Sequence, residues 1–279
     1  MLSKDDIQRR QQMWGTVLES VHGFFRSRGF EHFKTPLLVK SPGMEPNLDP
    51  FETQRKVADP AIQDQTLGLI TSPEYSMKKL LGVGFENIYS VTPVFRNYES
   101  GQHNLCEFTM LEWYSQGEYE DLMDETEALF QSVLEDKNAW PRLTFDEAQV
   151  DEYGDPQVDL ERFFVTQYPV AQAALARLSS DGRFAERFEA FANGLELCNG
   201  FVELTDPLEQ RQRFLSEQEE RRKLGKHVWP IDEELLEALS KIKNSVYGNA
   251  VGLDRLVMLK YGVSDINDIQ IFQAFGLRD

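Results

Sequence analysis

The sequence predicts an α+β domain built on a mostly antiparallel sheet. Strand-like segments come in runs, with helices between and around them, instead of alternating strictly with helices. The clearest strand pair lies between residues 88 and 114, where apolar side chains alternate on both sides of a polar loop. A chain of 279 residues is long enough to bury a sizeable core, as one large domain or two small ones.

The first 50 residues predict a long helix followed by extended segments. Residues 4–28 carry apolar side chains at helical spacing, and Gly29 is a typical stop. Residues 30–39 alternate like a strand, but Pro36 restricts that strand to a sheet edge or a bend. Prolines and a glycine make residues 41–50 a loop.

Short elements flank the central strand pair. Residues 66–71 are strand-like, and residues 73–81 are helical, because Ser72 suits the N-cap and a proline suits the first turn. An acidic helix is expected over 119–135. The polar segment 138–160, with its prolines and glycine, indicates a connector or a trimmed insertion.

The C-terminal half predicts further strands and helices. We expect them in this order: a strand over 163–170, a short helix near 171–178, a strand over 188–203, helices over 207–224 and 232–242, and a glycine turn entering a helix over 250–257.

The composition excludes several classes of protein. With 47 acidic residues against 29 Lys and Arg, the net charge is −18, and the scattered basic residues disfavour an extended nucleic-acid surface. No apolar run reaches the roughly 18 residues of a membrane helix, and the polar start does not resemble a signal peptide. Cys106 and Cys198 form no disulfide framework and no metal-ligand spacing. We therefore expect a cytoplasmic protein.

The central strand pair concentrates chemically active side chains. Arg96 follows the first apolar run, while Glu112 and Tyr114 share one face of the second. An arginine among carboxylates suits a substrate that carries both phosphate and amine. The alternative is an ordinary amphipathic hairpin with solvated charges.

Three other segments carry similar groups. Ser72-Pro73-Glu74 places a carboxylate at a helix start. Residues 189–203 hold three carboxylates and an amide on strand-like backbone, and residues 248–256 place Arg255 after small residues where a helix begins. Taken alone, each has a structural explanation: Ser-Pro-Glu as a cap, the acidic pairs as solvated groups, and Asp254 as a helix cap.

As an ordered set, these segments resemble the motifs of class II aminoacyl-tRNA synthetases. Residues 96–114 are similar to motif 2, and the Gly-x-Asp-Arg-Leu sequence at 252–256 is similar to motif 3. Residues 31–36 are similar to the proline-bearing motif 1, which forms the dimer interface of that family. Residues 71–80, 107–114 and 199–206 look most like the freestanding lysyl-tRNA synthetase paralogues that attach (R)-β-lysine to elongation factor P.

The resemblance implies a single class II catalytic domain over 1–279 that uses ATP and Mg²⁺. Arg96 matches the arginine on the α-phosphate and the substrate carboxylate, and Arg255 matches the arginine on the γ-phosphate, so these two are the expected catalytic residues. The implied ATP-binding residues are Arg96, Glu99, His103, Asn104 and Arg255, and the implied Mg²⁺ ligands are Glu189 and Glu196. Tyr98 stands where the family has Glu, and the segment from His103 to Glu107 is one residue longer than in the family. Either Glu99 or Tyr98 therefore meets the adenine, and either His103 or Asn104 lies by the triphosphate.

The resemblance also implies a pocket for an amino acid with two ammonium groups. Its implied residues are Ser72, Glu74, Glu112, Tyr114, Asn199, Glu203 and Ala250. Ala250 stands where lysyl-tRNA synthetases tend to have glycine, which favours β-lysine over lysine.

The implied acceptor is a lysine side chain of elongation factor P, in a homodimeric enzyme. The first helix begins almost at the first residue, which leaves no room for an N-terminal anticodon-binding domain, so we expect no tRNA acceptor and no membrane partner. Two alternatives stay open. One is a ligase for another acceptor, such as a carrier protein or a small amine; the other is a synthetase paralogue that has lost catalysis.

Overall fold

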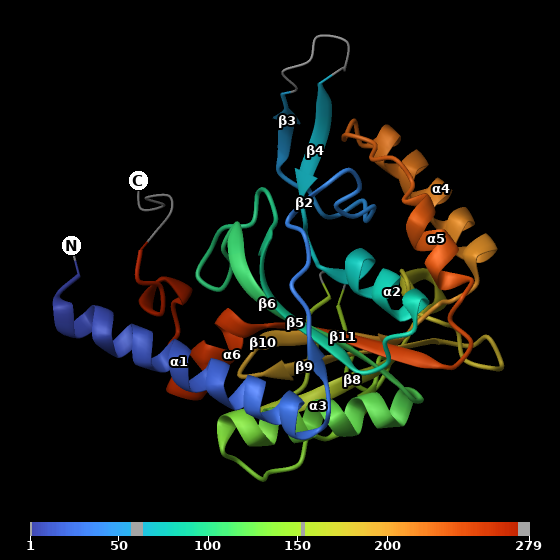
Figure 1. Cartoon of the computed structure of the whole chain (residues 1–279). Helices are drawn as coiled ribbons and strands as arrows, with labels where there is room; N and C mark the ends of the chain where they lie inside the picture. The colour runs from blue at the N-terminus through green and yellow to red at the C-terminus, as the bar shows by residue number, and fades with distance from the viewer. Residues whose placement is uncertain (1, 57–63, 152–153, 273–279) are drawn as a thin grey trace.

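The computed structural model describes residues 2–56, 64–151 and 154–272, and its main feature is a mixed sheet (Figure 1). Within those residues eight strands lie in the order β1 (Glu31–His32), β5 (Ile88–Phe95), β6 (Glu107–Gln116), β11 (Val246–Gly252), β10 (Leu195–Val202), β9 (Ala185–Ala192), β8 (Arg162–Tyr168) and β7 (Arg142–Thr144). Neighbouring strands are antiparallel except for the outermost pairs, β1–β5 and β7–β8. The predicted α+β class and mostly antiparallel sheet are confirmed.

Helices lie on both sides of this sheet. The described helices are α1 (Lys4–Ser27), α2 (Glu74–Val83), α3 (Tyr119–Leu134), α4 (Pro207–Lys223), α5 (Glu233–Leu239) and α6 (Leu253–Tyr261). Apolar side chains of α1, α3 and α6 pack with those of the central strands into the largest core cluster. In Figure 1, α2, α4 and α5 lie together on the other side. None of the helices in the described residues has the length and apolar character needed to span a membrane.

The alternation of side chains along β6 decides which face is which. Leu111 and Trp113 are fully buried in the core under α1 and α3. Met110, Glu112 and Tyr114 point to the opposite face, as the period of two requires. The central strands therefore present an apolar face to the helices and a polar face to a cavity.

The predicted strand over 30–39 forms only at its two ends, and Pro36 interrupts it as expected. Its two ends form two-residue strands in different sheets, β1 in the main sheet and β2 (Leu38–Val39) in a small one. Pro36 lies between them and cannot donate a ladder hydrogen bond, so it separates the two strands. The small sheet has the order β2, β4 (Gln65–Leu69), β3 (Glu52–Arg55), and it projects from the main sheet (Figure 1).

The predicted single strand over 188–203 is wrong, because this segment is part of a hairpin. β9 ends at Ala192 and β10 begins at Leu195, and both turn residues, Asn193 and Gly194, have positive φ (50° and 74°). Asn-Gly is the sequence that favours such a two-residue turn. The turn pairs β9 with β10 and brings Glu189 opposite Asn199.

Two predictions for the middle of the chain need correction. The expected helix at 171–178 is only a 3₁₀ turn over Val170–Gln172, and Ala176 instead forms a bridge with Glu203. The expected connector at 138–160 contains β7, although residues 152–153 lie outside the described part of the chain. The β-bridge provides hydrogen bonds for backbone N–H and C=O groups of this segment, so no helix is needed to satisfy them.

The close packing of α2 against α5 gives a stability prediction. A Cβ added at Gly82 would lie 2.6 Å from backbone and side-chain atoms of Ala238. Gly82→Ala should therefore lower the free energy of unfolding by about 1–3 kcal/mol, measured by urea denaturation.

Gly15→Ala is the matched control for that change. Gly15 also lies inside a helix, but a Cβ there would meet no atom within 4 Å. The control should raise stability by about 0.5–1 kcal/mol. A Gly82→Ala protein as stable as the wild type would contradict the close packing.

Candidate active site

A cavity of about 530 Å³ opens on the polar face of the central strands. Side chains from β6, β9, β10 and β11 line it, together with the start of α2 and the loop between β5 and β6. The sequence-predicted residues that line it are Ser72, Glu74, Arg96, Glu99, His103, Asn104, Glu112, Tyr114, Glu189, Glu196, Asn199, Ala250 and Arg255. Glu203 is the predicted site residue that lies outside this lining, buried next to Gly248 and Tyr114, which do line it.

Small residues of β11 form part of the floor of the cavity. Gly248, Ala250 and Gly252 alternate along the strand on the cavity side. A Cβ at Gly248 would lie 2.4 Å from the Tyr114 ring and 2.7 Å from Glu203 Oε1. Glycine is therefore required at 248, because any side chain would separate Glu203 from the cavity.

Glu112 is held by two hydroxyl groups at one end of the cavity. Ser72 Oγ donates to Glu112 Oε2 and Tyr114 Oη donates to Glu112 Oε1, each over 2.5 Å. Burial, together with the nearby Glu74, raises the pKa of Glu112 to about 8. A cationic ligand would offset the cost of ionising this carboxylate.

Ser72 does not cap α2, which corrects the prediction at this helix start. The helix begins at Glu74, and Pro73 occupies the N-cap position. Ser72 Oγ nevertheless accepts a hydrogen bond from the Glu74 backbone N–H over 3.0 Å. This contact orients the hydroxyl toward Glu112.

A buried lysine connects the remaining two carboxylates. Lys78 Nζ lies 2.5 Å from Glu74 Oε1 and also forms an ion pair with Glu203 Oε2. Burial raises the pKa of Glu203 to about 8, although Lys78 opposes that shift. Burial alone would lower the pKa of Lys78, but Glu203 and Glu74 together raise it above its usual value. Lys78 is therefore a stable ammonium behind the cavity wall.

Arg96 lies where β5 leaves the sheet. Its backbone N–H donates to Cys106 O over 2.9 Å, which extends the hairpin beyond the strands. The guanidinium lies 3.6 Å from Glu99 and 5.2 Å from the centre of the Phe108 ring. Its Nε is buried without a hydrogen-bond partner in the described residues. The group is held in the cavity with donors left for an oxyanion.

Arg255, in the first turn of α6, connects the β5–β6 loop to β10. It donates to Asn104 Oδ1 and to the Glu196 backbone carbonyl, both over 2.6 Å. Arg255 also donates to the His103 backbone carbonyl over 3.3 Å, and it lies 3.8 Å from the Glu196 carboxylate. Of His103 and Asn104, it is therefore Asn104 whose side chain contacts Arg255. Tyr98 is 82% exposed with φ 65°, whereas Glu99 lines the cavity.

Asp254 ties the start of α6 to β6 instead of capping the helix. The N-cap position is Gly252, and the Asp254 carboxylate accepts from the Thr109 backbone N–H and from Gln270, each over 2.7 Å. This contact fixes the first turn of α6, and with it the neighbouring Arg255, against the strand that carries Glu112.

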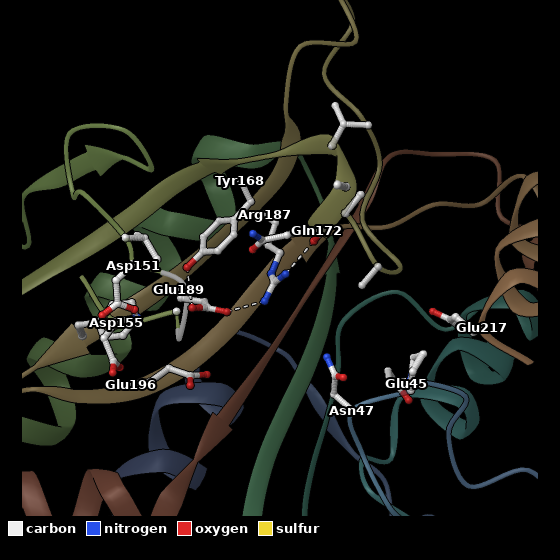
Figure 2. A pocket seen from close by; sticks show the side chains of 18 of the residues that line it. Glu45, Asn47, Asp151, Asp155, Tyr168, Gln172, Arg187, Glu189, Glu196 and Glu217 are labelled. Carbon is white, nitrogen blue, oxygen red and sulfur yellow. Dashed lines mark hydrogen bonds and ion pairs between the residues drawn. The ribbon is translucent and has the colours of Figure 1, made fainter. Parts of the chain in front are cut away.

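Figure 2 shows Glu189 and Glu196 in a larger hollow of about 1320 Å³ that adjoins the first cavity. The Glu189 carboxylate accepts from Tyr168 Oη at 2.6 Å and contacts the Arg187 guanidinium at 2.5 Å. No group of three or more His, Cys, Asp or Glu in the described residues is arranged to hold a metal. Two carboxylates nevertheless fit Mg²⁺, which keeps waters and phosphate oxygens as its other ligands.

Arg187 and Lys78 are site residues that the sequence analysis did not identify. Arg187 also donates through Nε to Asn199 Oδ1 over 3.0 Å, so it connects the Glu189 end to the amino-acid end. It precedes Glu189 by two residues and therefore lies on the same strand face. Lys78 follows Glu74 by four residues on α2, the spacing of a helical ion pair.

Comparison with known proteins agrees with this arrangement. The sequence model of the family described as tRNA synthetases class II (D, K and N) matches residues 1–275. The chain belongs to this class II synthetase family. The predicted fold family is thereby confirmed, and the cavity on the antiparallel sheet is its candidate active site.

Three similar proteins are named elongation factor P–(R)-beta-lysine ligase. Those of Pectobacterium atrosepticum and Proteus mirabilis are 37% and 36% identical, over 93% of this chain and 93% of each relative. That of Vibrio atlanticus is 34% identical over 92% of this chain and 93% of the relative. The similarity of this class II synthetase to them therefore extends over nearly the whole of both chains.

The raised pKa of Glu112 predicts a pH-dependent stability. Its folded value of about 8 exceeds the ordinary value of 4.5, so the protonated carboxyl stabilises the fold at low pH and that contribution is lost as pH rises through 8. The difference in melting temperature, wild type minus Glu112→Gln, should therefore decrease as the pH is raised from about 5 to about 8. Glu219→Gln removes an exposed carboxylate on α4 and is the control. A difference that rises with pH would contradict the assignment.

Proposed function

We propose that this class II synthetase is an ATP-dependent ligase. It adenylates (R)-β-lysine and transfers it to a lysine side chain of elongation factor P. One observation carries the proposal: the guanidinium groups of Arg96 and Arg255 line the same cavity as the buried carboxylates of Glu74 and Glu112. Such a cavity suits a substrate whose carboxylate meets a phosphate while its ammonium groups meet carboxylates. The names of the similar ligases support this choice of amino acid and acceptor.

In the first step the β-lysine carboxylate attacks the α-phosphorus of ATP. A bond forms between the carboxylate oxygen and phosphorus, and pyrophosphate leaves with the electron pair. Arg96 binds the α-phosphate and the carboxylate, because its free donors face the cavity. Arg255 binds the γ-phosphate, held in place by Asn104 and by the strand that carries Glu196. The attacking carboxylate is already ionised, so no general base is needed.

Glu189 and Glu196 are the proposed Mg²⁺ ligands. Tyr168 and Arg187 orient the Glu189 carboxylate, and Glu196 lies on the adjacent strand. The bound ion would neutralise charge on the phosphates during adenylation. Glu99, His103 and Asn104 complete the proposed ATP site along the β5–β6 loop.

Two groups of carboxylates receive the two ammonium groups of the amino acid. Glu112 and Glu74 receive the amine nearer the carboxylate, and Glu203 receives the other in the space that Gly248 leaves beside it. Ser72, Tyr114 and Asn199 complete this pocket. A ligand without the second ammonium would leave a buried carboxylate unpaired, which is a strong basis for discrimination.

Ala250 is proposed to favour the β-amino isomer. It pairs with Glu112 across β11 and β6, so its methyl group lies beside the carboxylate that receives the first amine. A methyl group at this point changes the space available to the amine. Moving that amine from the α- to the β-carbon changes its position relative to the carboxylate, which is bound by Arg96.

In the second step a neutral lysine amine of the acceptor attacks the acyl carbon. The carbon–nitrogen bond forms, and AMP leaves with the carboxyl oxygen bound to phosphorus. The larger hollow gives the acceptor a route to the acyl group, because it adjoins the cavity and shares Glu189, Glu196 and Arg255 with it. The amine must lose a proton first, so transfer should accelerate as pH rises.

We also propose a homodimer. β1 lies at the edge of the main sheet, and residues 31–36, which contain it, resemble the dimer-forming motif 1. Light scattering should then give twice the chain mass of 32.2 kDa, and a monomer at micromolar concentration would exclude the dimer.

Adenylation is tested by ATP–pyrophosphate exchange that depends on (R)-β-lysine. Arg96→Ala should lower exchange by about 10²–10³-fold, the usual effect of losing a charged group on the transition state. Arg142→Ala is the control, because Arg142 lies on β7 and pairs with Glu120 and Asp124 outside the cavity. Unchanged exchange in Arg96→Ala would contradict the proposal.

The acceptor and the isomer are tested by intact-mass measurement. Elongation factor P, a carrier protein and tRNA are each incubated with enzyme, ATP and one isomer, either (R)-β-lysine, (S)-β-lysine or lysine. The expected result is one added β-lysyl group on elongation factor P, with (R)-β-lysine giving the fastest reaction. Transfer only to another acceptor would replace this part of the proposal.

A further inference from the structure

Lys78 is a buried charge that the proposed reaction does not use. Its side chain comes from α2, and only 2% of the residue is exposed. Besides its contacts with Glu74 and Glu203, the ammonium lies 5.4 Å from the centre of the Phe201 ring. It does not line the cavity, so it does not touch the substrate directly.

Three buried carboxylates surround the amino-acid end of the cavity: Glu74, Glu112 and Glu203. Among the described ion pairs, Lys78 is the cation that contacts this trio, and it bridges two of its members. Glu112 is held by neutral hydroxyl groups instead. Three negative charges and one positive charge leave the empty pocket with two uncompensated carboxylates when all are ionised.

The other titratable groups around the trio come from neighbouring elements. Tyr114 on β6 donates to Glu112, and Tyr75 on α2 is buried near the same carboxylates. Glu45, in the loop before β3, interacts with Glu74 and with Arg96, and Glu217 on α4 lies beyond it. Arg96 opposes the charge of Glu45 and Arg213 opposes that of Glu217, which leaves the balance within the trio to Lys78.

We infer that Lys78 is a specificity-determining residue that sets the free charge of the amino-acid pocket at two, to match the two ammonium groups of a diamino acid. The inference rests on the proposed function, because that function assigns the trio to the two amines. Lys78 acts through the carboxylates it contacts and is a positioning residue for their charge.

The physical reason is the cost of an uncompensated charge in a dry pocket. With two free carboxylates, a diammonium ligand pairs every charge, whereas a ligand with one ammonium leaves a carboxylate unpaired. Without Lys78 the pocket would contain three. A diammonium ligand can pair with only two of these three carboxylates. The third must then take up a proton or stay ionised without a partner, and either costs binding free energy.

The test compares Lys78→Met, Glu74→Gln and the double variant by (R)-β-lysine-dependent ATP–pyrophosphate exchange between pH 5.5 and 9.5. In Lys78→Met the loss of the ammonium disfavours ionisation of the carboxylates. The acid limb of kcat/KM should therefore move up by about one pH unit. At pH 7 we expect KM to rise about tenfold, with kcat little changed. Losing a neighbouring negative charge in Glu74→Gln should move the limb down. The double variant should return it close to the wild-type position.

These outcomes separate charge balance from a structural ion pair. An acid limb that stays at the wild-type pH in Lys78→Met, or that fails to return in the double variant, would overturn the inference. If Lys78→Met does not fold, the double variant is used instead, because it adds no unpaired carboxylate. The pH of its acid limb is then compared with that of Glu74→Gln. Acid limbs at the same pH in the double variant and in Glu74→Gln would also overturn the inference. Wild-type enzyme without exchange contradicts the proposed function itself, whereas wild-type exchange with unmoved limbs contradicts only the assignment of Lys78.

Discussion

The period-two alternation of the central strands is the constraint on which the rest of the structure depends. Each of β6, β9, β10 and β11 buries one row of side chains against α1, α3 or α6 and presents the other to the cavity. Slipping β6, β9 or β10 by one residue would exchange the two rows and place carboxylates in the apolar core. The hydrophobic core therefore fixes the register of the site, and polar groups far apart in the sequence converge because their apolar neighbours must be buried.

The cavity combines charges that are costly to bury with contacts that limit that cost. Glu112 is kept in place by hydroxyl groups, Glu189 by Tyr168 and Arg187, and Glu203 by Lys78. These partners orient the carboxylates without neutralising all of them. The residues of the site thus leave negative charge uncompensated, and a cationic ligand would supply the missing positive charge.

The sequence reveals the parts of this arrangement that depend on local pattern. The face shared by Glu112 and Tyr114 follows from alternation alone, and the ordered motifs indicate which distant segments converge. The hairpin turn at Asn193-Gly194 also has a sequence signal, although apolar residues on both sides make the segment resemble one strand. The pairing of Lys78 with Glu203 has no such signal, because α2 and β10 meet only through tertiary packing. The same holds for Asp254, whose partner on β6 depends on the final position of α6.

The missing side chain at Gly248 has a consequence for ligand length. Glu203 Oε1 lies beside the Tyr114 ring on the cavity side of β11, and the space where a Cβ of residue 248 would stand is the space next to that oxygen. A ligand anchored by its carboxylate at Arg96 must extend along the cavity as far as Gly248 before its terminal cation reaches Glu203. The pocket therefore selects ligands by the distance between their carboxylate and their terminal ammonium group. A homologue shorter by one methylene would have the correct charges but would stop short of the buried oxygen.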